Sequence, residues 1–345
     1  MLLMKSEKMY SIAIRKRNGE NDFFWNHDNY IFEELNIDCK NRYWLADPFL
    51  FEKEGKAYVF YEAFDLIERK GKIGFSVIQE KTCKLPIHIV LDEPYHLSFP
   101  NIFEYDGDIF MMPETCGDNS IKLFKATSFP NKWEEHKTLL PDIFACDTIL
   151  VQDKHNKIYL LTNEMYNDHD KTPNGNYISC WVKNVCFKLD DGLKVEGAGT
   201  LVAEGDCGIR NAGKTFECNG KLYRVGQNCP NKQYGKGVVL FEVESINPYR
   251  EKLLWIKNCE EFDSHIIKLE DYDIIGVHTY NFCNNYEIID FSQIRDWKHI
   301  TMLIKKKIDL ICKIVNLRVR IFNRFRRLLW PIFNASRSCV NLNEE

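Results

Sequence analysis

The chain has 345 residues, of which 45% are hydrophobic and 13% aromatic, a composition typical of a globular protein with a large core. Its formal net charge of −4 is unevenly distributed: residues 1–292 carry 34 basic and 46 acidic side chains, whereas residues 293–345 carry 12 and 4. An acidic body repels phosphates, so we expect no nucleic-acid partner.

The thirteen cysteines include no C-x-x-C pair, which favours reduced thiols in the cytosol. The N-terminus has no apolar run typical of a signal peptide, and no stretch reaches the roughly 18 apolar residues of a transmembrane helix. We therefore expect a cytoplasmic protein, peripheral on the inner face of the membrane.

Five similar segments follow one another along the chain, each with an apolar run, a turn and a second apolar run, as in a β-hairpin. They are Ala46–Ala63, Ser98–Thr115, Ala145–Glu164, Ile209–Asn228 and Asp263–Asn281. The second runs share an anchor position, occupied by Tyr58, Phe110, Tyr159, Tyr223 and Ile274, at separations of 49 to 64 residues. Two further strands per repeat would complete four-stranded blades.

This period predicts an all-β fold, a five-bladed β-propeller, in the domain formed by residues 1–292. The blades are expected near residues 44–92, 96–141, 145–204, 209–257 and 263–292, with an N-terminal strand, 10–15, completing the fifth. A β-sandwich with repetitive hairpins is the alternative, and the regular period disfavours it. Residues 293–345 would form a helical tail and a loose C-terminus.

Polar residues recur at matching places in the repeats. Four residues after each anchor stand Glu62, Glu114, Asn163, Gln227 and His278, and the first runs open with Asp47, Ser98, Asp147, Arg210 and His265. Since the inner strands of a propeller line its channel, these residues should meet in one axial pocket. For each residue taken singly, hydrating the channel or capping a loop remains an open alternative.

Carboxyl groups gathered in a partly dry pocket repel one another, so one should keep its proton as a general acid while another stays ionised as base or nucleophile. Such carboxyl pairs catalyse glycosyl transfer and glycoside cleavage. Aromatic residues near the mouth, including Tyr234, could stack on sugar faces. The chain has no P-loop, dinucleotide fingerprint or zinc-ligand spacing, so we expect no metal and no cofactor.

Several long motifs are similar to those of a known family: ADPFLF (46–51), HLSFPNIFEYDGDIFMMPET (96–115), CDTILV (146–151), RNAGKTFECNGKLYRVGQNC (210–229) and GVHTYNF (276–282). They resemble the N-terminal propeller-like domain of plant glucosamine inositolphosphorylceramide transferase, found also in bacterial surface-polysaccharide loci. More distantly, the chain is similar to five-bladed glycoside hydrolases such as arabinanases, β-xylosidases and invertases.

The second resemblance implies catalytic roles for three residues: Asp47 as base or nucleophile, Glu114 as acid, and Asp147 as the carboxylate that orients and tunes. The hydrolases usually carry the acid in a later blade, so Asp147 is the alternative acid. Substrate-binding candidates are Glu62, His96, Ser98, Asn163, Arg210, Gln227, Tyr234 and His278.

Residues 298–330 predict a cationic amphipathic helix in which Asp309 is the one acidic residue. Such a helix suits an anionic membrane surface; the alternative is packing on the acidic body or on a second subunit. The leading function is glycosyl transfer from a sugar nucleotide or lipid-linked glycan in cell-surface polysaccharide or glycolipid biosynthesis. A glycoside hydrolase with the same carboxylates, or a non-catalytic glycan-binding or scaffolding propeller, are the alternatives.

Overall fold

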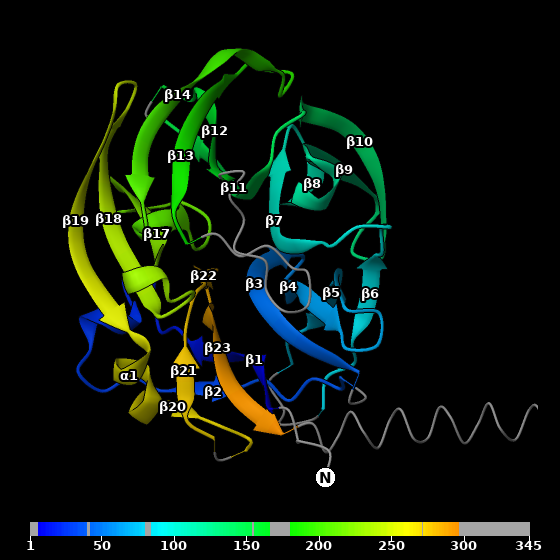
Figure 1. Ribbon diagram of the computed structural model, residues 1–345, viewed down its shortest axis with the longest axis vertical. Coiled ribbons are helices and arrows are strands. Elements are labelled where there is room, and N and C mark those ends of the chain that lie inside the picture. The colour runs from blue at the N-terminus through cyan, green and yellow to red at the C-terminus, as the bar shows by residue number, and fades with distance from the viewer. Residues whose placement is uncertain are drawn as a thin grey trace, which may run out of the picture. The chain divides into compact units, whose positions relative to one another are not determined.

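The computed structural model describes residues 6–39, 42–79, 84–153, 155–165, 180–270 and 272–296. Their strands form five antiparallel sheets, apart from one short parallel pair, and the sheets are arranged around a central axis (Figure 1). The fold is a five-bladed β-propeller within Ser6–Arg295, which confirms the predicted fold class. The predicted tail helix, 298–330, lies outside the described residues.

The first three blades are four-stranded meanders. Blade 1 contains β3 (Tyr43–Lys53), β4 (Lys56–Asp65), β5 (Lys70–Val77) and β6 (His88–Leu91); blade 2 contains β7 (Ser98–Tyr105), β8 (Asp108–Glu114), β9 (Ser120–Ser128) and β10 (Lys132–Pro141); blade 3 contains β11 (Ala145–Gln152), β12 (Ile158–Met165), β13 (Val182–Leu189) and β14 (Val195–Gly205). The 3-10 turn η2 (Cys116–Asp118) follows β8.

Blade 4 has a divided first strand, β15 (Cys207–Asn211) and β16 (Phe216–Cys218), followed by β17 (Lys221–Asn228), β18 (Gly237–Ile246) and β19 (Tyr249–Asn258). The turn η3 (Pro230–Lys232) joins β17 to β18, and the short helix α1 (Cys259–Phe262) and the turn η4 (Asp263–His265) lead from β19 to blade 5. No helix among the described residues has the length and apolar character needed to cross a membrane.

Blade 5 joins the two ends of the described chain. Its first strand is divided into β21 (Ile274–Gly276) and β22 (Tyr280–Phe282), which pair with β23 (Tyr286–Asp296); β1 (Ser6–Lys16), β2 (Phe32–Glu34) and the short β20 (Ile266–Ile267) follow outward, with η1 (Phe24–Asn26) between β1 and β2. N-terminal β1 lies between β2 and C-terminal β23, so hydrogen bonds close the ring.

The fifth repeat was wrongly aligned at the sequence level. His265 does not open an inner strand: it lies in η4 beside β20 at the outer edge of blade 5, and its Nδ1 lies 3.0 Å from the Tyr30 carbonyl oxygen. The inner strand is β21–β22, and His278 lies between its two halves. The segment 263–269 therefore resembles the first strand of a repeat only in its apolar pattern.

Turn chemistry explains the hairpins of blades 1, 2 and 4. Both central residues of each turn, Glu54-Gly55, Asp106-Gly107 and Asn219-Gly220, have positive φ, between 49° and 77°. Such two-residue turns match the twist of the flanking strands, and glycine adopts this conformation without steric cost. The blades then pack through buried aromatic rings, such as Phe49 against Phe99 with centroids 4.8 Å apart.

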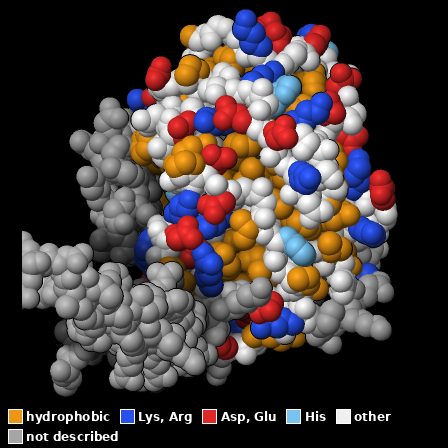
Figure 2. All heavy atoms as spheres, turned by 90° about the vertical axis from the view of Figure 1, so that its right-hand side faces the viewer, with side chains coloured by type: hydrophobic (Ala, Val, Ile, Leu, Met, Phe, Trp, Pro, Cys, Tyr) orange, Lys and Arg blue, Asp and Glu red, His pale blue; other side chains and the backbone are white. Residues whose placement is uncertain are grey.

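The outer strands of blades 1 and 2 present a mixed surface. Figure 2 shows acidic and basic side chains interspersed over this face, with apolar side chains between them. Exposed charges of blade 2 pair directly, as Lys125 does with Asp108 at 2.6 Å. Opposite charges that alternate in this way produce no extended field of one sign.

Candidate functional site

The inner strands of blades 1, 2 and 3 each bend where they open. The pairing register shifts between Ala46 and Phe49, between Ser98 and Asn101, and between Cys146 and Ile149. The residue at which each shift begins has positive φ: Asp47 (49°), Phe99 (45°) and Asp147 (47°). A bulge of this kind redirects a side chain, and strained residues of this kind cluster at functional sites.

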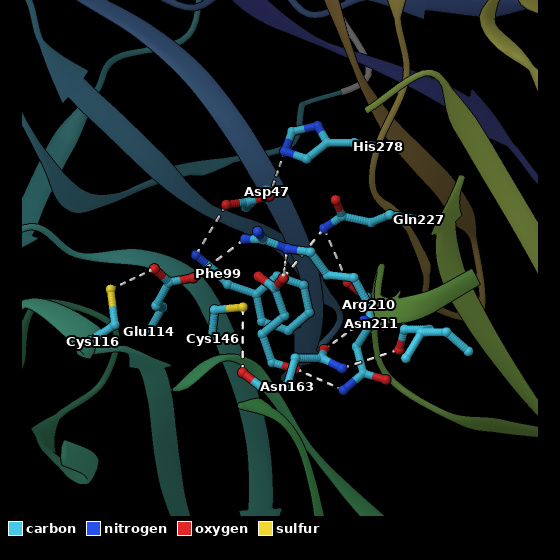
Figure 3. Close-up of polar contacts among 12 residues, drawn as sticks. Asp47, Phe99, Glu114, Cys116, Cys146, Asn163, Arg210, Asn211, Gln227 and His278 are labelled. Carbon is cyan, nitrogen blue, oxygen red and sulfur yellow. Dashed lines mark hydrogen bonds and ion pairs between the residues drawn. The ribbon is translucent and has the colours of Figure 1, made fainter. Parts of the chain in front are cut away.

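Asp147 and Glu114 both lie close to Arg210. Figure 3 shows the Arg210 side chain reaching toward Glu114. Arg210 Nε donates to Asp147 Oδ2, and Arg210 Nη2 lies 3.8 Å from Glu114 Oε2. Gln227 Nε2 lies 3.4 Å from the same Asp147 oxygen. Cys146 joins this group: one ligand-type atom each of Glu114, Cys146 and Asp147 lies within 4.8 Å of the others.

One guanidinium therefore serves two buried carboxyl groups. Burial and the Asp147 charge raise the pKa of Glu114 to about 7, against the opposing effect of Arg210. Burial also raises the pKa of Asp147, and Arg210 again opposes the rise. Because Asp147 is in direct contact with Arg210, the more distant Glu114 is the member of this pair that exchanges a proton near neutral pH.

His278 bridges Asp47 and Asp290. Its Nε2 lies 3.2 Å from Asp47 Oδ1, and its Nδ1 lies 2.9 Å from Asp290 Oδ2. Burial disfavours the charged ring, but Asp290 and Asp47 together raise the pKa of His278 to about 10. His278 is thus an imidazolium at neutral pH and balances part of the negative charge.

Asp290 also fixes the junction of blades 1 and 5. Its carboxylate accepts hydrogen bonds from the backbone N–H groups of Asp47 (2.9 Å), His278 (3.1 Å) and Thr279 (3.0 Å). Burial works against ionisation, yet His278 and these donors keep the pKa of Asp290 below its usual range. The second oxygen of Asp47, Oδ2, accepts from Phe99 N–H at 3.2 Å.

The remaining predicted residues have different surroundings. Glu62 is 5% exposed, and its Oε1 lies 3.3 Å from His96 Nε2. Ser98 is buried opposite Glu114 in the β7–β8 register. Both ends of the Asn163 amide bind blade 4 backbone, at Ile209 O (3.0 Å) and Asn211 N (2.7 Å), so this side chain ties blade 3 to blade 4.

Tyr234 belongs to an aromatic wall beside His278 and Arg210. Its ring centroid lies 5.2 Å from the His278 ring and 5.0 Å from the Arg210 guanidinium carbon. The Tyr10 ring lies 4.8 Å from His278 and 5.3 Å from Trp44. The sequence pointed to Tyr234 near the mouth but not to Tyr10.

Asp290 is the main residue that sequence reasoning missed. It lies four residues after Tyr286, the same spacing that separates Tyr58 from Glu62. With Ile274 as the anchor of the fifth repeat, the spacing of four residues points to His278 instead. Aligning that repeat on Tyr286, after the Cys283–Asn285 turn, would have found Asp290.

Two groups of described residues have the composition of a cation site: Asp47, His278 and Asp290, and Glu114, Cys146 and Asp147. Each already contains or contacts a protein cation. His278 presents one ring nitrogen to each carboxylate of the first group, and Arg210 contacts both carboxyl groups of the second. Residues on this chain thus provide the positive charge that a metal ion would otherwise supply.

Comparisons with known proteins agree with this architecture. Residues 22–260 match the family model described as glucosamine inositolphosphorylceramide transferase 1, N-terminal. The Arabidopsis thaliana protein of that name is 33% identical over 218 residues, 60% of this chain and 26% of its own length. The Oryza sativa subsp. japonica protein is 31% identical over 204 residues. The chain thus spans about a quarter of the length of the curated relatives it matches.

Solved structures share the fold. The α-L-arabinofuranosidase of Podospora anserina, in complex with cellotriose, superimposes with a TM-score of 0.53 at 8% identity, over 76% of this chain and 96% of its own. The catalytic domain of the Coprinopsis cinerea α-L-arabinofuranosidase gives 0.51 at 8% identity, over 83% and 98%.

Proposed function

Since the chain belongs to the family of the N-terminal domain of glucosamine inositolphosphorylceramide transferase 1, we propose that it acts on a carbohydrate in its axial pocket. The reaction is glycosyl transfer in glycolipid or cell-surface polysaccharide biosynthesis. The observation that carries this proposal is the convergence of Asp47, Glu114 and Asp147 with Arg210 and His278.

Each carboxyl group has a defined part in the proposed chemistry. Asp47, aligned by Phe99 N–H and His278, acts as base or nucleophile. Glu114, with a pKa of about 7, exchanges protons at neutral pH, as an acid–base catalyst must. Asp147 stays with Arg210 and orients the guanidinium. A pair of carboxyl groups in different protonation states is the requirement of glycosyl chemistry.

The polar and aromatic side chains around Asp47 and Arg210 support a hydroxyl-rich ligand, which would reach the enclosed atoms among them only after side chains move. Among the described residues, the fully enclosed atoms without a hydrogen bond of normal geometry include Asp47 Oδ1, Gln227 Oε1 and Thr279 Oγ1. Such atoms are rare in proteins and call for an explanation. Sugar hydroxyl groups donate and accept hydrogen bonds, and the aromatic wall of Tyr10, Trp44 and Tyr234 suits the apolar face of a sugar ring.

The donor is a sugar nucleotide or a lipid-linked glycan, and the site of action is the cytoplasmic membrane face. The support is the basic composition of residues 298–330. Each basic side chain near an anionic leaflet contributes about 1 kcal/mol of binding free energy. A protein held at that face meets lipid-linked intermediates rather than polysaccharide to digest, which favours transfer over hydrolysis.

The test is a screen of the purified protein against nucleotide sugars and lipid-linked sugars, with product mass as the readout. Transfer predicts a product heavier than the acceptor by one sugar residue. A free sugar released with water as acceptor would instead support a glycoside hydrolase. Glycan binding without any new mass would contradict both and leave a non-catalytic propeller.

A further inference from the structure

A further buried carboxyl group, that of Glu62, lies on blade 1 near Asp47. Glu62 is on β4, directly opposite Ala46, the residue before Asp47. Its side chain is 6% exposed, whereas that of His96, in the connection from β6 to β7, is 31% exposed. Oε1 of Glu62 is fully enclosed and lies 3.3 Å from His96 Nε2 without the alignment of a hydrogen bond.

The protonation of His96 follows from its other nitrogen. The backbone N–H of Gly71 donates to His96 Nδ1 at 2.9 Å, so Nδ1 is an acceptor and carries no proton. A ring nitrogen without a proton makes the imidazole neutral, and the partial burial of His96 lowers its pKa, which favours the same state. The single ring proton therefore sits on Nε2, the atom that faces Glu62.

Gly71 is required for this arrangement. A Cβ added at residue 71 would lie 2.7 Å from Glu62 Oε1 and 2.8 Å from His96 Cε1, and still closer to the Leu97 carbonyl oxygen. The Leu97 N–H donates to Gly71 O at 3.1 Å, which holds the connection against β5. Any side chain at residue 71 would separate the imidazole from the carboxyl group.

Other acidic groups surround Glu62. Burial, followed by the charges of Asp47 and Glu114, raises its pKa well above the usual range; Asp290 adds to the rise and His278 opposes it. Glu114, by comparison, has Arg210 at 3.8 Å and the Cys116 thiol at 3.0 Å. Of these two glutamates, Glu114 has a guanidinium at 3.8 Å, whereas the burial and the neighbouring carboxylates of Glu62 favour its protonated form.

We propose that Glu62, positioned by His96 and Gly71, takes the place of Glu114 as the proton donor to the leaving group, and that the glycosyl donor is consequently an O-glycoside of an alcohol. The inference rests on the proposed glycosyl transfer and narrows its substrate class. An alkoxide leaving group needs a proton, whereas a phosphate leaving group of a sugar nucleotide leaves as a stable anion.

The transfer breaks one bond at the anomeric carbon, forms another, and moves two protons. As the bond from the anomeric carbon to the bridging oxygen breaks, the electron pair stays on that oxygen, which receives the Glu62 proton. The acceptor hydroxyl oxygen forms the new bond to the anomeric carbon and gives its proton to Asp47. The Glu62 carboxylate left behind faces the His96 Nε2–H donor. Proton exchange with water restores both carboxyl groups.

The test compares donors that differ in their need for a proton. Octyl glycosides and glycosyl fluorides of glucose, galactose and N-acetylglucosamine, in both anomers, are given to the wild type, Glu62→Gln and Glu114→Gln. Glu62→Gln should lose about 10²- to 10⁴-fold in turnover of the octyl glycoside but remain near wild type with the fluoride, because fluoride leaves without a proton. Glu114→Gln should not show this selectivity.

Two outcomes overturn the inference: equal losses on both donors in Glu62→Gln, or a wild type that uses sugar nucleotides and no octyl glycoside. The second leaves glycosyl transfer itself intact. A measurement without substrate distinguishes a failure of the proton-donor assignment from a failure of the proposed function. Carbon-13 NMR of glutamate-labelled protein at pH 7 should show a protonated carboxyl signal that Glu62→Gln removes and Glu114→Gln retains. Its absence from the wild type would refute the proton donor, whereas its presence without turnover of any donor would refute the proposed function.

Discussion

Blade 4 contributes two buried arginines whose surroundings differ. Arg224 donates to Glu251 from Nε and Nη2, at 2.8 and 2.6 Å, and one cation meets one carboxylate. Arg210 instead lies between Asp147 and Glu114, where a single guanidinium serves two carboxyl groups. The Arg224–Glu251 pair, with equal charges of opposite sign, joins strands of one blade. The Arg210 group, with two carboxyl groups for one guanidinium, keeps an exchangeable proton. Excess acid over base around the axis is thus what distinguishes the pocket from an ordinary buried ion pair.

The largest effects are expected from removing either arginine. Arg210→Met leaves Asp147 and Glu114 without their guanidinium and should lower the free energy of unfolding by about 3–5 kcal/mol, measured by urea denaturation. Arg224→Met removes the partner of the less deeply buried Glu251 and should lower it by somewhat less. Turnover below the unfolding transition should then separate them: Arg210→Met loses activity and Arg224→Met keeps it. Equal losses of turnover in the two variants would remove the distinction between the two regions.

The pH dependence of stability sharpens the comparison. The pKa of Glu114 is about 7 in the folded chain against a usual 4.5. Its stabilising contribution is therefore fully present below pH 4.5 and is lost as the pH rises through 7. The Gln side chain of Glu114→Gln has no proton to lose. The free energy of unfolding of this variant, relative to that of wild type, should therefore increase by about 1–3 kcal/mol between pH 4.5 and 8. Urea denaturation across this range measures the difference.

Glu251→Gln is the matched control, because it removes a carboxylate from the balanced pair. It should be less stable than wild type at both ends of the range. A constant difference between Glu114→Gln and wild type would show that Glu114 has no raised pKa.

The smallest effect concerns the aromatic wall. Tyr234 contacts the Arg210 guanidinium at 5.0 Å and the His278 ring at 5.2 Å. Tyr234→Leu should weaken glycan binding by about 1 kcal/mol, roughly fivefold, in isothermal titration calorimetry. The control is Tyr223→Leu on the same blade, whose ring stacks on Phe216 and whose loss should leave affinity unchanged. Equal weakening in both would indicate a general loss of packing.

The sequence predicts the propeller because its repeat combines local signals: apolar runs, turns such as Asn219-Gly220, and a polar residue four places after each anchor. The same signals point to Asp47, Glu62, Glu114 and Asp147. They fail at the fifth blade, where Asp263–Leu269 has a suitable apolar pattern yet pairs at the outer edge. Pattern alone cannot distinguish an inner from an outer strand, so Asp290 was missed.

Protonation states were beyond sequence reasoning for a different reason. The neutral Nε2–H form of His96 depends on a hydrogen bond from Gly71, 25 residues away. The sharing of Arg210 between Glu114 and Asp147 depends on contacts among blades 2, 3 and 4. The positive φ values at Asp47 and Asp147 come from bulges that hydrophobic alternation does not reveal.

The most direct test of the account is the turnover of Asp47→Asn on the donor and acceptor that the screen identifies. Asparagine keeps the shape of the side chain but can act neither as base nor as nucleophile. The account predicts that turnover falls by at least about 10²- to 10⁴-fold, with glycan affinity and cooperative unfolding retained. Turnover within a few-fold of wild type would contradict a catalytic role for the carboxylates of the axial pocket.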